Sequence, residues 1–208
     1  MSVAVVHVVD DDAAIRDSLK WLIESVGLQV KTYASAHTFL QHQRLGKVLS
    51  LGCLLLDVRL RDMNGLALLE RLQQGAFQLP VIMISGHGDV PMAVRAMKAG
   101  ALDFVQKPFN DQPLLELLQA AILLSEEQLK VRERLEDLQA HFEQLSPRER
   151  QVMEKVVEGQ TNREIAAQLG LSHKTVEAHR SKVMEKMAVD SLPQLVKCSL
   201  ALQGKNEA

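Results

Sequence analysis

The sequence predicts an α/β domain with a doubly wound, five-stranded parallel sheet, followed by a helical linker and an all-α domain of four helices. Three observations lead to this fold class. Apolar runs alternate with amphipathic helical patterns through residue 124, an apolar seam free of Pro and Gly covers residues 114–145, and only helical patterns follow. We therefore expect domains at residues 1–124 and 145–208, joined by a helical linker at 125–144.

Five short apolar runs in the first domain are expected to form buried parallel strands. Amphipathic stretches near residues 13–26, 35–43, 65–73 and 89–98 separate them, and a fifth helix begins near residue 112. This alternation implies right-handed crossovers and hence a doubly wound sheet. The expected strands are Val3–Val9, Gln29–Tyr33, Gly52–Asp57, Leu79–Ile84 and Leu102–Gln106.

The seam over Leu114–Leu145 repeats every seven residues. Gln128 is its only polar member, and Glu127 and Arg132 are placed to pair across a parallel dimer. Two interpretations stay open for residues 124–145, a dimeric coiled coil and a solvated linker, while Leu114–Leu124 is expected to pack on its own sheet. The seam positions are Leu114, Leu117, Ala121, Leu124, Gln128, Val131, Leu135, Leu138, Phe142 and Leu145.

The C-terminal domain has clear helix boundaries. Ser146-Pro147-Arg148-Glu149 is a capping box, and the first helix closes at Gly159. A second helix covers about Asn162–Leu169 and closes at Gly170, a third covers Ser172–Lys186, and a fourth runs from about Ser191 to Leu202. A short helix, a tight turn and a longer basic helix form a helix-turn-helix.

Composition and charge set limits on function. The chain of 208 residues has a net charge of -2, which combines about -1 in residues 1–124, -3 in 125–144 and +2 in 145–208. Neither a membrane span nor a signal peptide is expected, so we place the protein in the cytoplasm. Its two cysteines, Cys53 and Cys198, lack metal-ligand spacing, and Cys53 is expected to be a buried thiol.

Polar or charged residues end four of the apolar runs. The carboxyl ends of parallel strands meet at one rim, where doubly wound sheets bind ligands. Clustered carboxylates repel one another unless a cation lies among them, and an all-oxygen set suits Mg²⁺, with Mn²⁺ as an alternative. Beside the metal and Lys107, Asp57 is placed as a nucleophile toward a phosphoryl group, giving an acyl phosphate. The rim residues are Asp10, Asp11, Asp57, Ser85 and Lys107.

These residues resemble the receiver domain of two-component response regulators, over roughly Ser2 to Leu124. Gly86–Val94 and Lys98–Gly100 are similar to the FixJ-like branch of the NarL/FixJ type. The resemblance implies a flavodoxin-like fold in which Asp57 is the phosphoacceptor. It also implies a metal site formed by Asp10, Asp11, Asp57 and the backbone carbonyl of Arg59.

The same resemblance assigns the residues that respond to phosphate. Ser85 would be the switch hydroxyl, Phe104 the switch aromatic, and Lys107 the phosphate-binding lysine, followed by Pro108, where the family often has a cis peptide. Ser85 replaces the commoner Thr, and Phe104 replaces the commoner Tyr and lacks its hydroxyl. For His87, which flanks the site, tuning of phosphate lifetime and a plain loop role stay open.

The C-terminal residues resemble a LuxR/NarL-type DNA-binding domain. The similarity covers about residues 145–200 and rests on Leu145–Glu149, Asn162–Ala166, Leu169–Ser172 and Thr175–His179. It implies that helix 172–186 enters the major groove of DNA. Candidate base contacts are Glu177, Ala178, Arg180 and Ser181, and candidate phosphate contacts are Lys174, Thr175 and Lys182.

Together these features predict a transcriptional regulator that a sensor histidine kinase phosphorylates on Asp57. The phosphorylated form is expected to dimerise and bind promoter DNA, with RNA polymerase as a further partner and no membrane partner. We expect a phosphoacceptor with at most slow self-dephosphorylation rather than an enzyme. Two alternatives are a haloacid-dehalogenase-type phosphatase, although Asp57-Val58-Arg59 lacks the second acid that it needs, and a phosphorelay or protein-interaction module.

Overall fold

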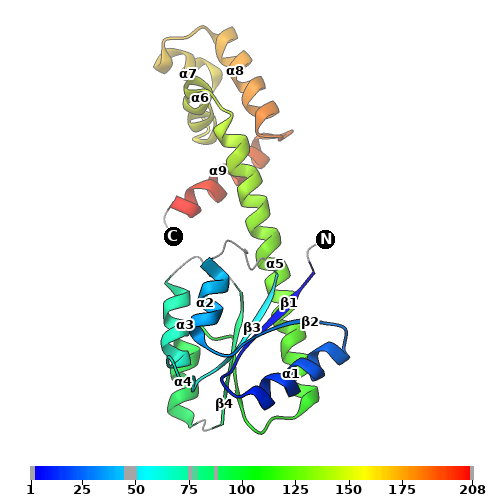
Figure 1. Ribbon diagram of the computed structural model, residues 1–208. Coiled ribbons are helices and arrows are strands. Elements are labelled where there is room, and N and C mark those ends of the chain that lie inside the picture. The colour runs from blue at the N-terminus through cyan, green and yellow to red at the C-terminus, as the bar shows by residue number, and fades with distance from the viewer. Residues whose placement is uncertain (1–2, 45–50, 75–76, 78, 87–88, 207–208) are drawn as a thin grey trace. The chain divides into compact units, whose positions relative to one another are not determined.

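The computed structural model describes residues 3–44, 51–74, 77, 79–86 and 89–206. The chain forms two compact units, Met1–Leu129 and Lys130–Ala208. The first contains a five-stranded parallel sheet and the second is helical, so the predicted fold class is confirmed (Figure 1). The boundary between the units falls inside the predicted linker of residues 125–144.

The sheet has the order β2-β1-β3-β4-β5, and neighbouring strands are parallel. From β1 the chain moves to one edge, and from β3 it moves to the other. This reversal opens a crevice at the carboxyl ends of β1 and β3, where doubly wound sheets place their ligands. The strands are β1 (Val5–Val9), β2 (Gln29–Tyr33), β3 (Gly52–Asp57), β4 (Val81–Ser85) and β5 (Asp103–Gln106).

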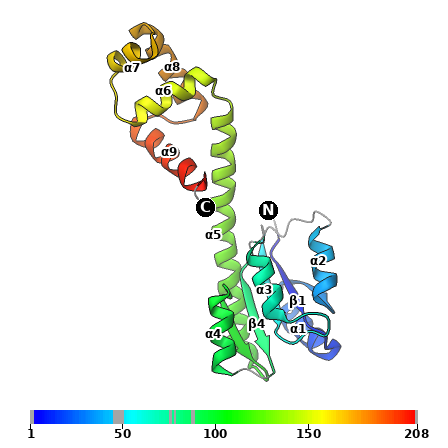
Figure 2. The ribbon, with the colours of Figure 1, turned by 90° about the vertical axis from the view of Figure 1, so that its left-hand side faces the viewer.

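Helices cover both faces of the sheet (Figures 1 and 2). Helices α2, α3 and α4 pack on one face, and α1 and the first part of α5 pack on the other. The predicted ends of the first four helices and the predicted start of the fifth lie within about two residues of the observed ones. The helices are α1 (Ala13–Ser25), α2 (Ala36–Arg44), α3 (Gly65–Gln73), α4 (Val90–Lys98) and α5 (Asp111–Glu143).

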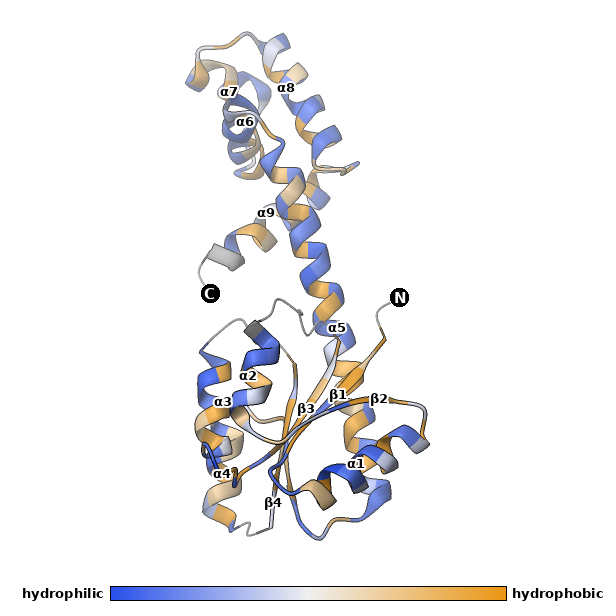
Figure 3. Cartoon of the chain, viewed as in Figure 1, coloured by the Kyte–Doolittle hydropathy of each residue, from blue (hydrophilic) through white to orange (hydrophobic). Residues whose placement is uncertain are grey.

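Successive residues of each strand enter different cores because side chains alternate across a sheet. In β3, Leu54 and Leu56 pack toward α2–α4, whereas Cys53 and Leu55 pack toward α1 and α5. Strands β3 and β4 are buried along their whole length, whereas the edge strand β2 is mostly polar and exposed, and Figure 3 shows this difference between β3 and β2. Cys53 has a free, fully buried thiol, and burial raises its pKa to about 12.

Helix α5 belongs partly to each unit. Leu114, Leu118 and Ala121 pack against the sheet, and the Ser125 hydroxyl accepts a hydrogen bond of 3.2 Å from the Gly52 amide at the start of β3. Near its other end, Leu138 packs in the core of the second unit. Both ends of the predicted seam are thus used within the chain.

The second unit contains four further helices: α6 (Pro147–Val157), α7 (Asn162–Leu169), α8 (His173–Lys186) and α9 (Leu192–Asn206). The predicted capping box is present, because Ser146 and Glu149 accept hydrogen bonds from each other's backbone amides. Gly170 ends α7 at φ 66°, a left-handed conformation that suits glycine and turns the chain into α8. Helix α9 ends four residues later than predicted. Within the described residues, every helix is too short or too polar to cross a membrane.

Candidate functional site

Three of the predicted rim residues converge at the crevice of the sheet. Asp10 follows β1 directly, Asp57 ends β3, and Lys107 follows β5. The Lys107 ammonium donates hydrogen bonds of 2.6 Å to Asp10 Oδ2 and 2.7 Å to Asp57 Oδ1. Both acids are buried, with exposed fractions of 1% for Asp10 and 5% for Asp57. Two carboxylates therefore meet around one cationic group.

Burial and charge act in opposite directions on these groups. Burial raises the pKa of Asp57, and the neighbouring Asp10 raises it further, while the hydrogen bond from Lys107 partly offsets the rise. Burial alone would lower the pKa of Lys107, but its bonds to Asp10 and Asp57 raise it overall. Lys107 consequently stays charged beside Asp57, where it can balance negative charge that develops on an incoming group.

The loop after β3 holds the second oxygen of Asp57. The Arg59 amide donates to Asp57 Oδ2 at 2.8 Å, and Arg59 pairs with Asn64 in an isolated antiparallel bridge. Gly65 begins α3 directly against the Asp57 backbone, and a Cβ at this position would collide with the Asp57 carbonyl oxygen. The phosphoacceptor candidate is thus fixed through its side chain and its backbone.

The remaining aspartates of the first loop have different partners. Asp12 caps α1 by accepting from the Ala14 amide at 2.8 Å. Asp11 Oδ2 accepts from Arg61 Nε at 2.9 Å. On the other side, Arg16 Nη1 donates to the Asp10 carbonyl at 2.7 Å. Of this acidic run, only Asp10 is hydrogen bonded to Lys107 in the structure.

Ser85 and Phe104 lie on the neighbouring strands. The Ser85 hydroxyl is buried at the end of β4 and is 3.9 Å from the Met92 sulfur on α4. Phe104 is half-buried on β5 and packs against the core under α2–α4. The Ser85 carbonyl accepts from the Lys107 amide at 2.8 Å, and the Lys107–Pro108 peptide is cis. His87 lies outside the described residues.

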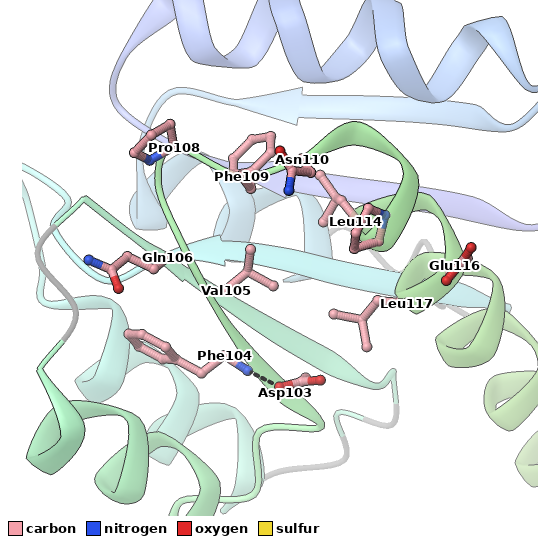
Figure 4. A pocket seen from close by; sticks show the side chains of 11 residues that line it. Asp103, Phe104, Val105, Gln106, Pro108, Phe109, Asn110, Leu114, Glu116 and Leu117 are labelled. Atoms are coloured by element: carbon pink, nitrogen blue, oxygen red, sulfur yellow. Dashed lines mark hydrogen bonds between the residues drawn. The ribbon is translucent and has the colours of Figure 1, made fainter.

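A groove of about 610 Å³ lies between β5 and the start of α5 (Figure 4). Phe104 and Val105 line it from the strand, and Phe109, Leu114 and Leu117 line it from the following segment. None of the five predicted rim residues lines this groove, although the predicted switch aromatic, Phe104, does. The groove is therefore distinct from the carboxylate cluster.

Helix α8 has an inner and an outer side. Val176 and Val183 are buried in the core of the second unit. Arg180 lies on the same side, where its Nη1 donates to Asn162 Oδ1 of α7 at 2.7 Å. This geometry favours a role for Arg180 in holding α8 against α7, rather than the predicted base contact. The exposed predicted contacts are Lys174, Glu177, Ala178, Ser181 and Lys182, while Thr175 is half-buried beside the Ser172 cap.

A charged pair joins the start of α6 to the end of α8. Lys186 Nζ lies 2.7 Å from Glu149 Oε2, and Glu149 also accepts from the Ser146 amide. The bond from Lys186, followed by that from Ser146, lowers the pKa of Glu149 to about 2. Lys186 thereby belongs to the framework of the domain.

Comparisons with known proteins agree with this geometry. Residues 6–119 match the response regulator receiver domain, and residues 143–199 match the bacterial regulatory proteins of the luxR family. The chain belongs to the response regulators. This response regulator joins a receiver domain to a LuxR-type DNA-binding domain, which confirms the predicted family and the predicted function in phosphorylation-dependent regulation of transcription.

Relatives of this response regulator cover nearly its whole length. It is 42% identical over 200 residues to the response regulator protein TmoT of Ectopseudomonas mendocina, covering 96% of this chain and 90% of that one. It is 45% identical over 195 residues to the transcriptional regulatory protein FixJ of Azorhizobium caulinodans, covering 94% and 91%. Among solved structures, it resembles the response regulator StyR with a TM-score of 0.84 at 40% identity, covering 95% of this chain and 98% of that one.

Sequence reasoning missed two arginines of the response regulator's rim. Arg16 contacts the Asp10 backbone and Arg61 contacts the Asp11 side chain. For Arg16 a signal was available, because it follows Asp12 by one helical turn and so faces back to the rim. Arg61 gave no such signal, because its position depends on how the loop after β3 folds.

Proposed function

We propose that Asp57 accepts the phosphoryl group of a sensor histidine kinase. A carboxylate oxygen attacks phosphorus, the bond from phosphorus to the kinase histidine breaks, and an acyl phosphate forms on Asp57. The observation that carries this proposal is the convergence of Asp10, Asp57 and Lys107, because Lys107 can balance the charge of the transferred group. The nearby Ser85 hydroxyl would then turn to a phosphoryl oxygen.

We propose that Mg²⁺ assists this transfer, with Mn²⁺ as an alternative. Within the described residues no set of three or more His, Cys, Asp or Glu has metal-site geometry. Mg²⁺ needs only one or two carboxylates, however, and completes its shell with water and phosphate oxygens. The all-oxygen donors Asp10, Asp11, Asp57 and the Arg59 carbonyl fit that chemistry, and the bound ion would offset charge on the phosphoryl group.

We infer that phosphorylation promotes a homodimer through α4 and β5. Ser85 contacts Met92 in the first turn of α4, so movement of Ser85 toward phosphate would disturb this helix. Val90, Val94 and Met97 expose large apolar side chains on α4. Phe104 packs against the same core as Met92, so it would move together with α4.

Beryllofluoride, a phosphate mimic, is expected to convert the protein from monomer to dimer when Mg²⁺ is present, which doubles the molar mass measured in solution. Light scattering of the full chain with and without the mimic measures this change. Val94→Asp should block the increase, whereas Val26→Asp, an exposed control on the segment after α1, should leave it intact. An unchanged mass for the wild-type protein would favour control by release of the DNA-binding domain.

The helical linker supports at most a short dimer contact. Its outer seam positions are used within each unit, which leaves Leu124, Val131 and Leu135 with Gln128 between them. Two heptads of this kind are too few for a stable coiled coil in isolation. We propose that this stretch adds to a dimer formed elsewhere rather than forming one alone.

We propose that the outer side of α8 reads promoter DNA, which places the protein in the cytoplasm with RNA polymerase as a further partner. Lys182→Ala should weaken binding to all DNA sequences. It should also reduce the slope of the logarithm of the binding constant against the logarithm of the salt concentration by about one, the loss of one phosphate contact. Glu177→Ala should instead change base preference, because a carboxylate accepts from cytosine. Binding measured over several salt concentrations distinguishes the two effects. Lys197→Ala removes the same charge from an exposed position on α9 and should have little effect.

The DNA-binding domain argues against both alternatives drawn from the sequence. A phosphatase of the haloacid-dehalogenase type would need a second acid two residues after Asp57, where the chain has Arg59. Steady turnover of a small phosphoester would support that enzyme. A protein-interaction module would show no salt-dependent binding to promoter fragments.

A further inference from the structure

Arg61 and Asp11 form a second ion pair at the rim. Lys107 contacts Asp10 and Asp57, whereas Asp11 Oδ2 is 2.9 Å from Arg61 Nε. The three carboxylates therefore have two different cationic partners. The Asp11 side chain is 22% exposed and Arg61 is 85% exposed, so solvent ions can reach the pair directly.

The loop that carries Arg61 is anchored on both sides of this residue. Before and after it, Arg59 and Asn64 form an antiparallel bridge. Next to it, the Asp62 carboxylate accepts from the amides of Ala36 at 3.3 Å and His37 at 2.9 Å, at the start of α2. The loop backbone thus holds the Arg61 guanidinium within reach of Asp11.

Asp11 is also one of the carboxylates proposed above to bind Mg²⁺. The guanidinium occupies one of the two Asp11 oxygens that could ligate a metal, and a positive charge nearby repels a divalent ion. Both effects act in the same direction. Because the pair is exposed, its strength is modest and is screened by salt.

We propose that Arg61 competes with the divalent cation for Asp11 and so raises the Mg²⁺ concentration that the site requires. This inference rests on the proposed metal site. It makes Arg61 a residue that sets metal affinity, and hence the metal level at which phosphorylation begins, without contact with the phosphoryl group.

The test is calorimetric titration of the full-length protein with MgCl₂ at low ionic strength. Arg61→Gln should tighten Mg²⁺ binding about two- to fivefold, the range expected for an exposed ion pair. Arg61→Lys should lie between the two proteins. Arg71→Gln, which removes the same charge near the end of α3, should change affinity much less. The advantage of Arg61→Gln should shrink at high salt.

Two results would overturn the inference while leaving the metal site intact. One is wild-type affinity in Arg61→Gln, and the other is weaker binding, which would mean that Arg61 orients Asp11 for the metal. The wild-type protein gives a second readout, since the Arg61 Nε–H signal in an NMR spectrum should shift as Mg²⁺ saturates the site. Absence of Mg²⁺ binding by the wild-type protein would instead overturn the proposed metal site and this inference with it.

Discussion

Asp57→Asn is expected to abolish formation of the acyl phosphate. The amide is nearly the same size as the carboxylate, so the Arg59 amide keeps an oxygen acceptor at this position. The amide is a far poorer nucleophile, and it removes the negative charge that binds Lys107. Labelling from a radioactive phosphodonor, followed by gel analysis, should fall to background.

A matched control separates this effect from a general loss of charge. Asp17→Asn makes the same change on the exposed surface of α1 and should be labelled like the wild-type protein. The purified Asp57→Asn protein should also unfold at a temperature similar to that of the wild-type protein. Persistent acid-stable or base-labile label in Asp57→Asn would move the phosphoacceptor to another residue.

Acidification from pH 6.5 to pH 4 is expected to destabilise the first unit by about 3 kcal/mol through His7 alone. Burial, followed by the charges of Lys31 and His42, lowers the pKa of His7 from 6.5 to about 4. Between pH 6.5 and pH 4, His7 is therefore protonated in the unfolded chain but neutral in the folded chain. Well above pH 6.5, His7 leaves the free energy of unfolding unchanged. As the pH falls below 6.5, that free energy decreases until the pH reaches the folded pKa of His7.

The surroundings of His7 explain why its pKa is lowered. His7 is 1% exposed, and its Nδ1 lies 3.0 Å from the Tyr33 hydroxyl. The two rings stack with their centroids 5.8 Å apart. The rings of Phe39 and His42 surround the His7 ring at 6.2 Å. A protonated imidazole would thus be buried among aromatic rings beside Lys31 and a second histidine.

Urea unfolding followed between pH 7.5 and pH 4 measures the effect. His7→Phe should be somewhat less stable at pH 7.5, because Tyr33 loses its partner, but its stability should fall much less on acidification. His37→Gln, a change on the exposed part of α2, should retain the wild-type slope. An unchanged slope in His7→Phe would assign the acid sensitivity to other groups.

The sequence predicts most of the rim because strand ends determine it. Asp10, Asp57 and Lys107 end or follow apolar runs, and a parallel sheet must bring such positions to one edge. Arg61 could not be placed in this way. Its contact with Asp11 depends on how the loop after β3 folds, and that loop is held partly by the bond from the His37 amide to Asp62, two residues far apart in sequence.

Periodicity explains a second difference. Val176, Arg180 and Val183 are spaced by four and three residues, which places Arg180 on the buried side of α8. The resemblance to the DNA-binding domain suggested a base contact for Arg180, whereas helical spacing indicates the contact with Asn162. In α5 the heptad repeat itself was real, but its two ends satisfy the cores of two separate units rather than a partner helix.

The hydrogen bond between Ser125 and Gly52 has a practical consequence for exchanging output domains among response regulators. Gly52 and Asp57 are the two ends of one buried strand, so the first part of the linker helix is attached to the strand that ends at the proposed phosphoacceptor. A chimera joined before Ser125 would replace this attachment with a foreign residue. A junction placed after Ser125 keeps the receiver whole and leaves the choice of DNA-binding domain free.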